Sequence, residues 1–97
     1  MTLWIATCEV SLKPGDIESG RTLAFTNIVT WGQDNEGALE NIRAYFAEYR
    51  WTLIECETIK PVEDGKDYGD ELNDLIERAA GNPNAVIYGT FHTYKPN

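Results

Sequence analysis

Apolar and polar residues alternate along the first part of the chain, and this period of two predicts a β-strand from Leu3 to Leu12. One side of that strand is wholly apolar: Trp4, Ala6, Cys8, Val10 and Leu12. The segment from Arg21 to Trp31 is rich in Thr, Val, Ile and Phe, which favour strands. Pro-Gly and Ser-Gly turn signals between the two segments indicate an antiparallel hairpin with a long loop over Lys13 to Gly20.

The spacing of apolar residues changes to a helical period after Asp34 and Asn35, either of which can cap a helix by accepting from free backbone N–H groups. From Glu36 onward the apolar positions recur every three or four residues: Ala38, Leu39, Ile42, Tyr45, Phe46 and Tyr49. A second helix is predicted from about Gly69 to Ala80. Its buried side comprises Leu72, Leu75, Ile76 and Ala79.

Trp51 to Pro61 and Ala85 to Tyr94 return to strand patterns, so the predicted order is β-β-α-β-α-β. The length suits one domain spanning residues 1–97. Because β-α-β units cross over right-handedly, the simplest fold is an α/β (α+β) two-layer sandwich. We predict a four-stranded mixed sheet with two helices on one face. This arrangement is similar to ferredoxin-like folds in size and layering, although its element order differs.

The same alternation assigns side chains to the two faces of the predicted sheet. We expect the helices to cover Trp4, Ala6, Cys8, Val10, Leu23, Phe25, Val29, Ile54, Cys56, Ile87 and Phe91. The opposite face is then bare, yet Thr, Ile and Tyr dominate it where a solvent face would carry more Lys, Glu and Gln. Such a patch marks an interface, so we predict a symmetric homodimer. Its contacts are predicted to come from Ile5, Ile28, Leu53, Tyr88 and Tyr94.

Charge narrows the classes of partner. The 97 residues include 16 Asp and Glu against 8 Lys and Arg, a formal net charge of -8. Phosphate contacts need Lys and Arg, so we expect no nucleic acid partner. No apolar run approaches the roughly 20 residues of a membrane-spanning helix, so we expect no membrane partner. The start lacks the basic segment of a signal peptide, which predicts a cytoplasmic protein whose cysteines, Cys8 and Cys56, are buried and reduced.

His92 is the single histidine of the chain, and with carboxylates it forms the one candidate acid–base or metal-binding group. The candidate partners on the predicted open face are Glu9, Glu55 and Glu57. The sequence therefore leaves open a small-molecule or metal-dependent enzyme that uses His92 and Glu55. No spacing typical of a nucleotide, metal or nucleophile motif supports this alternative, and we expect neither a cofactor nor a bound metal.

A run of acidic residues is the most distinctive feature of the sequence. From Glu63 to Glu77, seven carboxylates stand against the single cation of Lys66. The helix dipole favours acids at the start of the second helix, but the like charges of Asp70 and Asp74, four residues apart, oppose helix formation.

We therefore predict a non-enzymatic interaction module that docks a basic protein, with solubility as the alternative explanation of the charge. The predicted docking residues are Glu63, Asp64, Asp67, Asp70, Asp74 and Glu77. Immunity proteins that neutralise basic bacterial toxins share this general character of size and charge.

Overall fold

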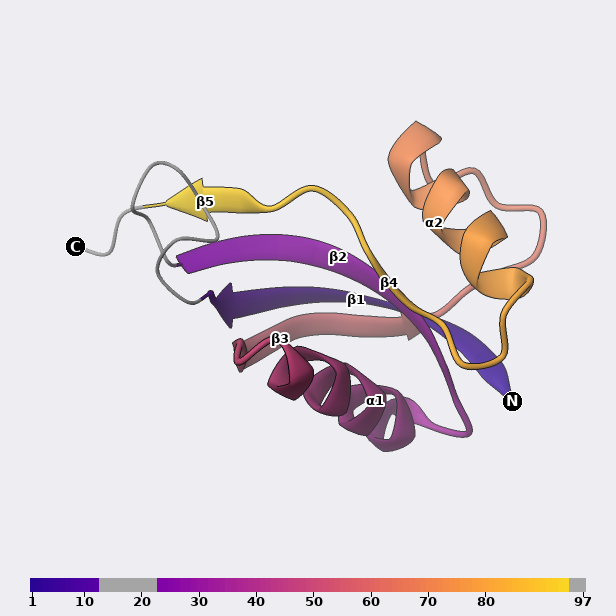
Figure 1. The fold of residues 1–97 in the computed structure, drawn as a ribbon. Helices are drawn as coiled ribbons and strands as arrows, with labels where there is room; N and C mark the ends of the chain where they lie inside the picture. The colour runs from indigo at the N-terminus through magenta and orange to yellow at the C-terminus, as the bar shows by residue number, and fades with distance from the viewer. Residues whose placement is uncertain (13–22, 95–97) are drawn as a thin grey trace.

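The computed structural model describes residues 1–12 and 23–94, which fold around one central sheet (Figure 1). The α+β class and the order β-β-α-β-α-β are confirmed, with the last strand divided into two short pieces. The loop predicted over Lys13 to Gly20 lies outside the described residues. The elements are β1 (Thr2–Ser11), β2 (Leu23–Gly32), α1 (Asn35–Glu48), β3 (Thr52–Pro61), α2 (Asp70–Ala80), β4 (Val86–Tyr88) and β5 (His92–Tyr94).

The described strands pair antiparallel throughout. The strand order is β3-β1-β2-β4, and β5 also pairs with β2. The predicted mixed sheet is therefore wrong. Strands β2 and β3, which α1 connects, run in the same direction, but β1 lies between them and pairs antiparallel with both. The parallel neighbours suggested by the β-α-β pattern are thus separated by one strand.

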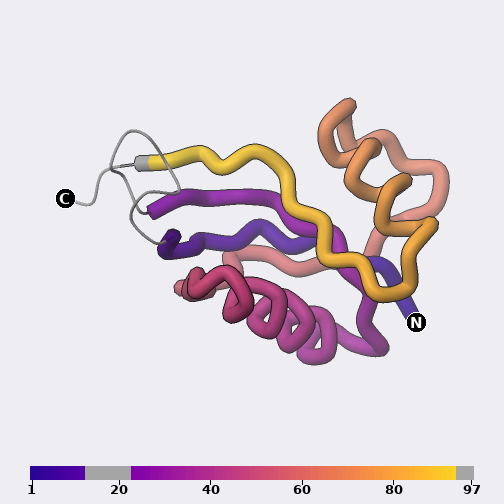
Figure 2. Tube along the Cα trace, in the orientation of Figure 1, coloured from indigo at the N-terminus to yellow at the C-terminus, as the bar shows by residue number. Residues whose placement is uncertain are grey.

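The two helices lie on opposite faces of the sheet, so the prediction that both cover one face is wrong (Figures 1 and 2). The buried cluster on the α1 face comprises Ala6, Cys8, Val10, Leu12, Ala24, Ile28, Ile42 and Phe46. The buried cluster on the α2 face comprises Val29, Leu75, Ala79 and Ala85. Near its start β1 is apolar at odd as well as even positions, where Leu3 and Ile5 flank Trp4. Both of its faces therefore need a cover.

Strand β2 is turned over relative to the prediction, so that Ile28, predicted on the open face, lies on the α1 face with Ala6. Its register places Ile28 opposite Ala6 on the α1 face, and Val29 opposite Ile5 on the α2 face. The strand is apolar on both faces, so its alternation could not choose between them, and a shift of one residue exchanges every side chain. The predicted grouping with Ala6 is therefore wrong for Leu23, Phe25 and Val29.

Because of two bulges, every third residue of β3 points towards the cluster on the α1 face. The pairing with β1 skips Ile54 and Glu57, and the inward residues are Leu53, Cys56 and Ile59. The prediction that Ile54 faces a helix is wrong, because 48% of its surface is exposed. Strict alternation cannot anticipate a bulge, since one inserted residue exchanges the faces of those that follow.

A third irregularity divides the last strand. Tyr88 pairs with Ile28 and His92 pairs with Phe25, so the last strand uses one residue more than β2 over the same stretch. The extra residue moves His92 to the α2 face, while Tyr88 stays on the α1 face. One continuous strand from Ala85 to Tyr94 was the expectation, and it is wrong at this point.

Local side-chain bonds fix where the helices begin. The Asp34 side chain accepts from the Gly37 N–H at 2.8 Å, which confirms Asp34 as the N-cap of α1. Before α2, the Asp67 carboxylate accepts from the Gly69 N–H at 2.9 Å and from the Asn73 side-chain amide at 2.8 Å. The chain entering α2 is therefore held by its own side chains.

Candidate functional site

Three of the four predicted acid–base residues, Glu55, Glu9 and His92, lie in a row across the α2 face. Cross-strand partners follow one another in the order Glu55, Glu9, Phe25 and His92. Phe25 thus separates His92 from Glu9, and Glu55 is one strand further away. Neighbouring strands are about 4.8 Å apart, which places the backbones of His92 and Glu55 roughly 14 Å apart. The structure does not bring together the pair on which the enzyme hypothesis depends.

A metal site is not formed by these residues either. In residues 1–12 and 23–94, no three His, Cys, Asp or Glu side chains are grouped so that they could hold a metal ion. Glu57 occupies a bulge of β3 with its side chain exposed. The side chains of a row across a sheet stand side by side, whereas metal ligands must converge on one point.

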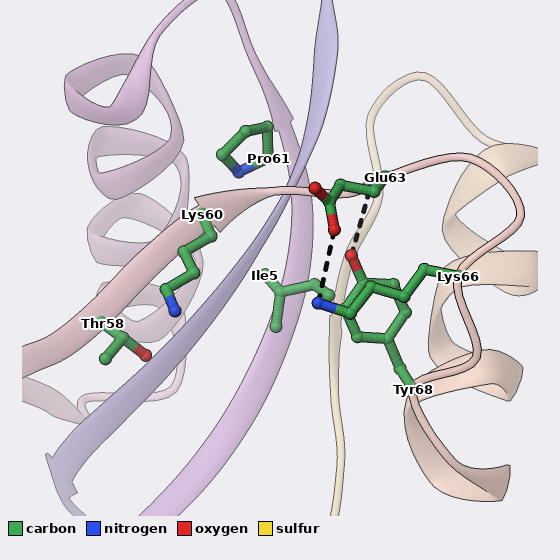
Figure 3. Close-up of a pocket in the computed structure, with 7 residues that line it drawn as sticks. All are labelled: Ile5, Thr58, Lys60, Pro61, Glu63, Lys66 and Tyr68. Atoms are coloured by element: carbon green, nitrogen blue, oxygen red, sulfur yellow. Dashed lines mark hydrogen bonds and ion pairs between the residues drawn. The ribbon is translucent and has the colours of Figure 1, made fainter.

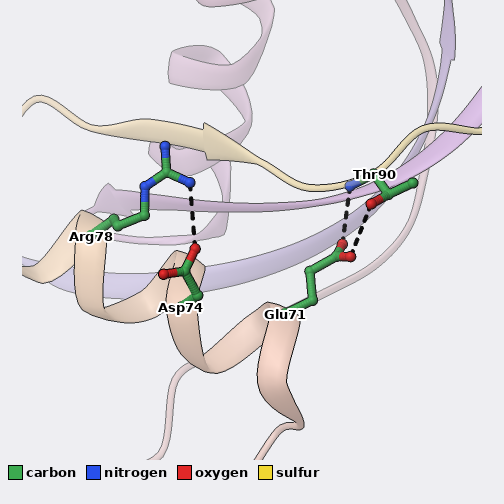
Figure 4. A network of polar contacts seen from close by, with 4 residues as sticks. All are labelled: Glu71, Asp74, Arg78 and Thr90. Carbon is green, nitrogen blue, oxygen red and sulfur yellow. Dashed lines mark hydrogen bonds and ion pairs between the residues drawn. The ribbon is translucent and has the colours of Figure 1, made fainter.

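The carboxylate that interacts electrostatically with His92 comes from α2. Glu71 accepts hydrogen bonds from the backbone N–H and from the hydroxyl of Thr90, both at 3.0 Å (Figure 4). These two bonds, with a smaller contribution from His92, hold the pKa of Glu71 below its ordinary value. The Glu71 carboxylate thereby provides a hydrogen-bond acceptor for the Thr90 N–H, at the point between β4 and β5 where the pairing with β2 is interrupted.

Sequence reasoning missed this role of Glu71 because its partner lies far along the chain. An acid in the first turn of a helix is already explained by the helix dipole. The usable signal is Gly89, since a glycine within a strand pattern suggests a bulge or a close approach. A Cβ atom added to Gly89 would collide with the Glu71 carboxylate.

The six predicted docking residues are all exposed, and three of them have partners within the chain. Asp67 is bonded within its own loop, which lowers its pKa. Glu63 pairs with Lys66 at 3.3 Å, and Asp74 pairs with Arg78 at 3.5 Å (Figure 4). Exposed ion pairs of this kind contribute little to stability.

The side chains of the other three docking residues make no hydrogen bond or ion pair with any described residue: Asp64, Asp70 and Glu77. Asp70, Asp74 and Glu77 follow one ridge of α2 at spacings of four and three residues, opposite the buried Leu75. We call the six predicted residues together the acidic α2 surface: Glu63, Asp64, Asp67, Asp70, Asp74 and Glu77.

A cleft of about 410 Å³ opens beside this surface on the α2 face (Figure 3). The Lys66 ammonium lies 3.3 Å from the Glu63 carboxylate and 5.0 Å from the centre of the Tyr68 ring. Sequence reasoning missed the cleft because β1, β3 and the following loop each supply part of it. Its lining comprises Ile5, Thr58, Lys60, Pro61, Glu63, Lys66 and Tyr68.

The five residues of the predicted dimer face do not share a surface. Ile28, Leu53 and Tyr88 pack in the cluster on the α1 face, where Ile28 is fully buried. Ile5 lies on the α2 face, and Tyr94 is in β5. The premise of a bare sheet face is wrong, because each helix covers one face. A homodimer stays a prediction, without an assigned surface.

Aromatic rings gather at the end of α1, on the α1 face. Trp51 stacks on Tyr49 at 4.9 Å between ring centres and meets Phe46 edge-on at 5.6 Å. The hydroxyls of Tyr45 and Tyr49 lie 3.3 Å apart, and this hydrogen bond, helped by burial, raises the pKa of Tyr45 to about 12. The cluster comprises Tyr45, Phe46, Tyr49, Trp51, Tyr88 and Phe91.

Comparison with known proteins adds no relative: no family model, no curated protein and no solved structure matches the chain. Among the described residues, neither helix is long and apolar enough to cross a membrane. The assignment of function therefore rests on the residues of this chain, and the cytoplasmic location stays a prediction.

Proposed function

We propose that the protein is an interaction module that binds a basic protein through the acidic α2 surface. The ridge of Asp70, Asp74 and Glu77 carries this proposal, because it projects from α2 on the side away from the core. An interface of this kind needs no catalytic group, and it agrees with the separation of His92 from Glu55.

Folding alone does not account for the charge of this surface. Asp67 bonds to Gly69 and Asn73, and Asp70 lies where the helix dipole favours an acid. Asp64 and Glu77 have neither explanation among the described residues. Asp70 and Asp74 repel each other across one turn of the helix, which costs stability. Retaining such charge is consistent with a role outside folding.

The partner that fits is a protein with a surface rich in Lys and Arg. Its attraction to the acidic α2 surface would speed association and would weaken as salt screens the charges. Basic toxins that immunity proteins neutralise are one class with this chemistry, and the support for that form of the proposal is the size and charge of the chain.

The test compares two triple variants of equal charge. In the first, Asp70→Lys, Asp74→Lys and Glu77→Lys reverse the ridge of α2 and move the formal net charge from -8 to -2. In the second, the exposed acids of α1, on the other face of the sheet, are reversed, so that the protein has the same net charge of -2: Glu36→Lys, Glu40→Lys and Glu48→Lys. Immobilised wild type captures candidate proteins from a lysate of the source cells, and each is then identified and purified.

Association rates of the purified basic protein decide the outcome. We expect a loss of at least tenfold at low salt for the α2 variant, near wild-type rates for the α1 variant, and slower wild-type association at high salt. An equal loss of association rate in both variants would show that only the net charge of the protein matters and would contradict docking at the acidic α2 surface. Equal association rates in all three proteins would exclude this surface as the docking site. Circular dichroism checks that both variants fold.

A further inference from the structure

The two cysteines of the chain meet across neighbouring strands. Cys8 of β1 and Cys56 of β3 are direct cross-strand partners, although nearly half of the chain lies between them. Both belong to the cluster on the α1 face, and both are free thiols in this structure. Cys8 is fully buried, as predicted, whereas Cys56 is only partly buried, which corrects the prediction for that residue.

The bulge at Glu57 creates this contact. Thr7 of β1 pairs with Thr58 of β3. The next pair is Cys8 with Cys56, so the ladder skips Glu57. Without the bulge, Cys8 would pair with Glu57, and Cys56 would turn to the α2 face. Alternation within each strand places both thiols on one face, but it does not give the register that makes them direct partners.

The two cysteines occupy positions that a cross-strand disulfide can join. Directly opposed residues of antiparallel strands have Cα atoms about 4.5 to 5.5 Å apart. Disulfides join residues whose Cα atoms are about 4.4 to 6.8 Å apart and whose side chains point the same way. Cys8 and Cys56 are opposed and share the α1 face, so they meet both conditions.

We propose that Cys8 and Cys56 are a covalent modification site, at which oxidation by a low-molecular-weight disulfide such as oxidised glutathione forms a Cys8–Cys56 disulfide that links β1 to β3. The proposal is independent of the proposed function. The Cys56 thiol loses its proton, and its sulfur attacks the glutathione disulfide and releases one glutathione thiolate. The Cys8 thiol then loses its proton, and its sulfur attacks Sγ of Cys56 and releases the second. Two protein thiols are oxidised to one disulfide, and one glutathione disulfide is reduced to two thiols.

Burial sets the order and the rate of these steps. Cys56 reacts first, because Cys8 is fully enclosed. The Cys56 thiol donates to the Thr58 carbonyl at 3.1 Å, and burial raises its pKa. Burial also raises the pKa of Cys8, with a contribution from Cys56. Arg43 on α1 lowers the pKa of Cys56 and Glu55 raises it. We expect a slow reaction that accelerates as the pH rises.

The link would tie the edge of the sheet to its interior. Strand β3 lies at the end of the strand order and pairs with β1 alone among the described strands, while β1 also pairs with β2. Closing a loop of nearly half the chain removes much entropy from the unfolded state. We expect the unfolding midpoint of the oxidised protein to rise by roughly 10 °C or more.

The first test incubates the reduced, folded protein with oxidised glutathione at mildly alkaline pH. We expect a product lighter by two hydrogens, with no thiol open to alkylation after denaturation, that migrates as a single chain on a non-reducing gel. A stable glutathione adduct on Cys56, a disulfide between two chains, or a protein that stays fully reduced would each overturn the proposal.

Single-cysteine variants separate the two steps. Cys8→Ser should accumulate one glutathione adduct on Cys56, because the resolving thiol is absent. Cys56→Ser should stay reduced while folded, because Cys8 is enclosed. A native Cys56→Ser that reacts as fast as Cys8→Ser would overturn the proposed order, and with it the pairing as described.

Wild-type protein provides a test that needs no variant to fold. The equilibrium constant for forming the Cys8–Cys56 disulfide is measured in buffer and in urea, at a fixed ratio of reduced to oxidised glutathione. We expect the constant to be about a thousandfold larger for the folded protein, because the unfolded chain must lose the entropy of closing a loop of this length. Equal equilibrium constants in buffer and in urea would show that the fold does not align the two thiols.

Discussion

The two faces of the sheet are built differently. On the α1 face, Ile28, Ile42 and Phe46 are fully buried, and aromatic rings extend the cluster to its edge. On the α2 face, the buried residues are smaller and none is aromatic: Val29, Leu75, Ala79 and Ala85. Around this smaller cluster lie the acidic α2 surface, the cleft with its lysines, and His92. The side that buries more apolar surface supports the fold, which leaves the other side free to carry charge.

The largest expected effect is a difference in stability between matched core truncations. Phe46→Ala should lower the free energy of unfolding by about 3–5 kcal/mol, because it empties the centre of the cluster on the α1 face. Leu75→Ala should cost about 2–3 kcal/mol, since α2 covers a smaller cluster and can settle towards the sheet. Urea unfolding followed by circular dichroism measures both.

Two outcomes of that experiment would change the comparison. A larger loss for Leu75→Ala would place the main core beneath α2. A change in the slope of free energy against urea, without a matching change in midpoint, would point to an altered unfolded state.

The sequence predicts the elements well because each has a local signal. The alternation from Leu3 and the helical period after Asp34 both depend on residues close together in the chain, and the structure confirms both elements. The face of each strand that a helix covers is harder to predict, because β1 and β2 carry apolar residues at both odd and even positions. Only the pairing of Ile28 with Ala6 decides which side α1 covers.

The candidate site depends even more on contacts between distant residues. The bulge at Glu57 brings Cys56 opposite Cys8, and the extra residue before His92 moves it to the α2 face. Neither irregularity has a residue pattern of its own. Alternation therefore groups Cys56 with Cys8 and His92 with Glu9 on the correct faces, but it cannot give the register that pairs the two cysteines and puts Phe25 between His92 and Glu9. The acidity of α2, by contrast, is a composition feature, and the exposure of its residues could be predicted directly.

An intermediate effect is expected at alkaline pH on the α1 face. Tyr49→Phe should lower the pKa of Tyr45 from about 12 towards the ordinary value of 10.0, because it removes the hydrogen bond that is the main cause of the shift. Since the folded pKa lies above the unfolded one, this contribution to stability is complete below pH 10 and is lost as the pH rises towards 12. Absorbance titration of the phenolate measures the pKa. An identical titration curve in Tyr49→Phe would assign the shift to another group.

The smallest expected effect is at acid pH on the α2 face, where the Thr90 amide resonance should report the ionisation of Glu71. The folded pKa of Glu71 lies below 4.5, so the bonds to Thr90 are complete above that pH and are lost as the pH falls through the folded value. Glu71 is exposed, so the readout is the NMR shift of one amide rather than global unfolding. Glu71→Gln should abolish the titration while keeping an acceptor for Thr90, and Asp74→Asn, one turn away, should leave it unchanged. A Thr90 shift that titrates equally in Glu71→Gln would mean that another acid holds the bulge. Together with the titration of Tyr45, the result would show that the α2 face loses the Glu71–Thr90 bonds at acid pH and that the α1 face loses the Tyr45–Tyr49 bond at alkaline pH.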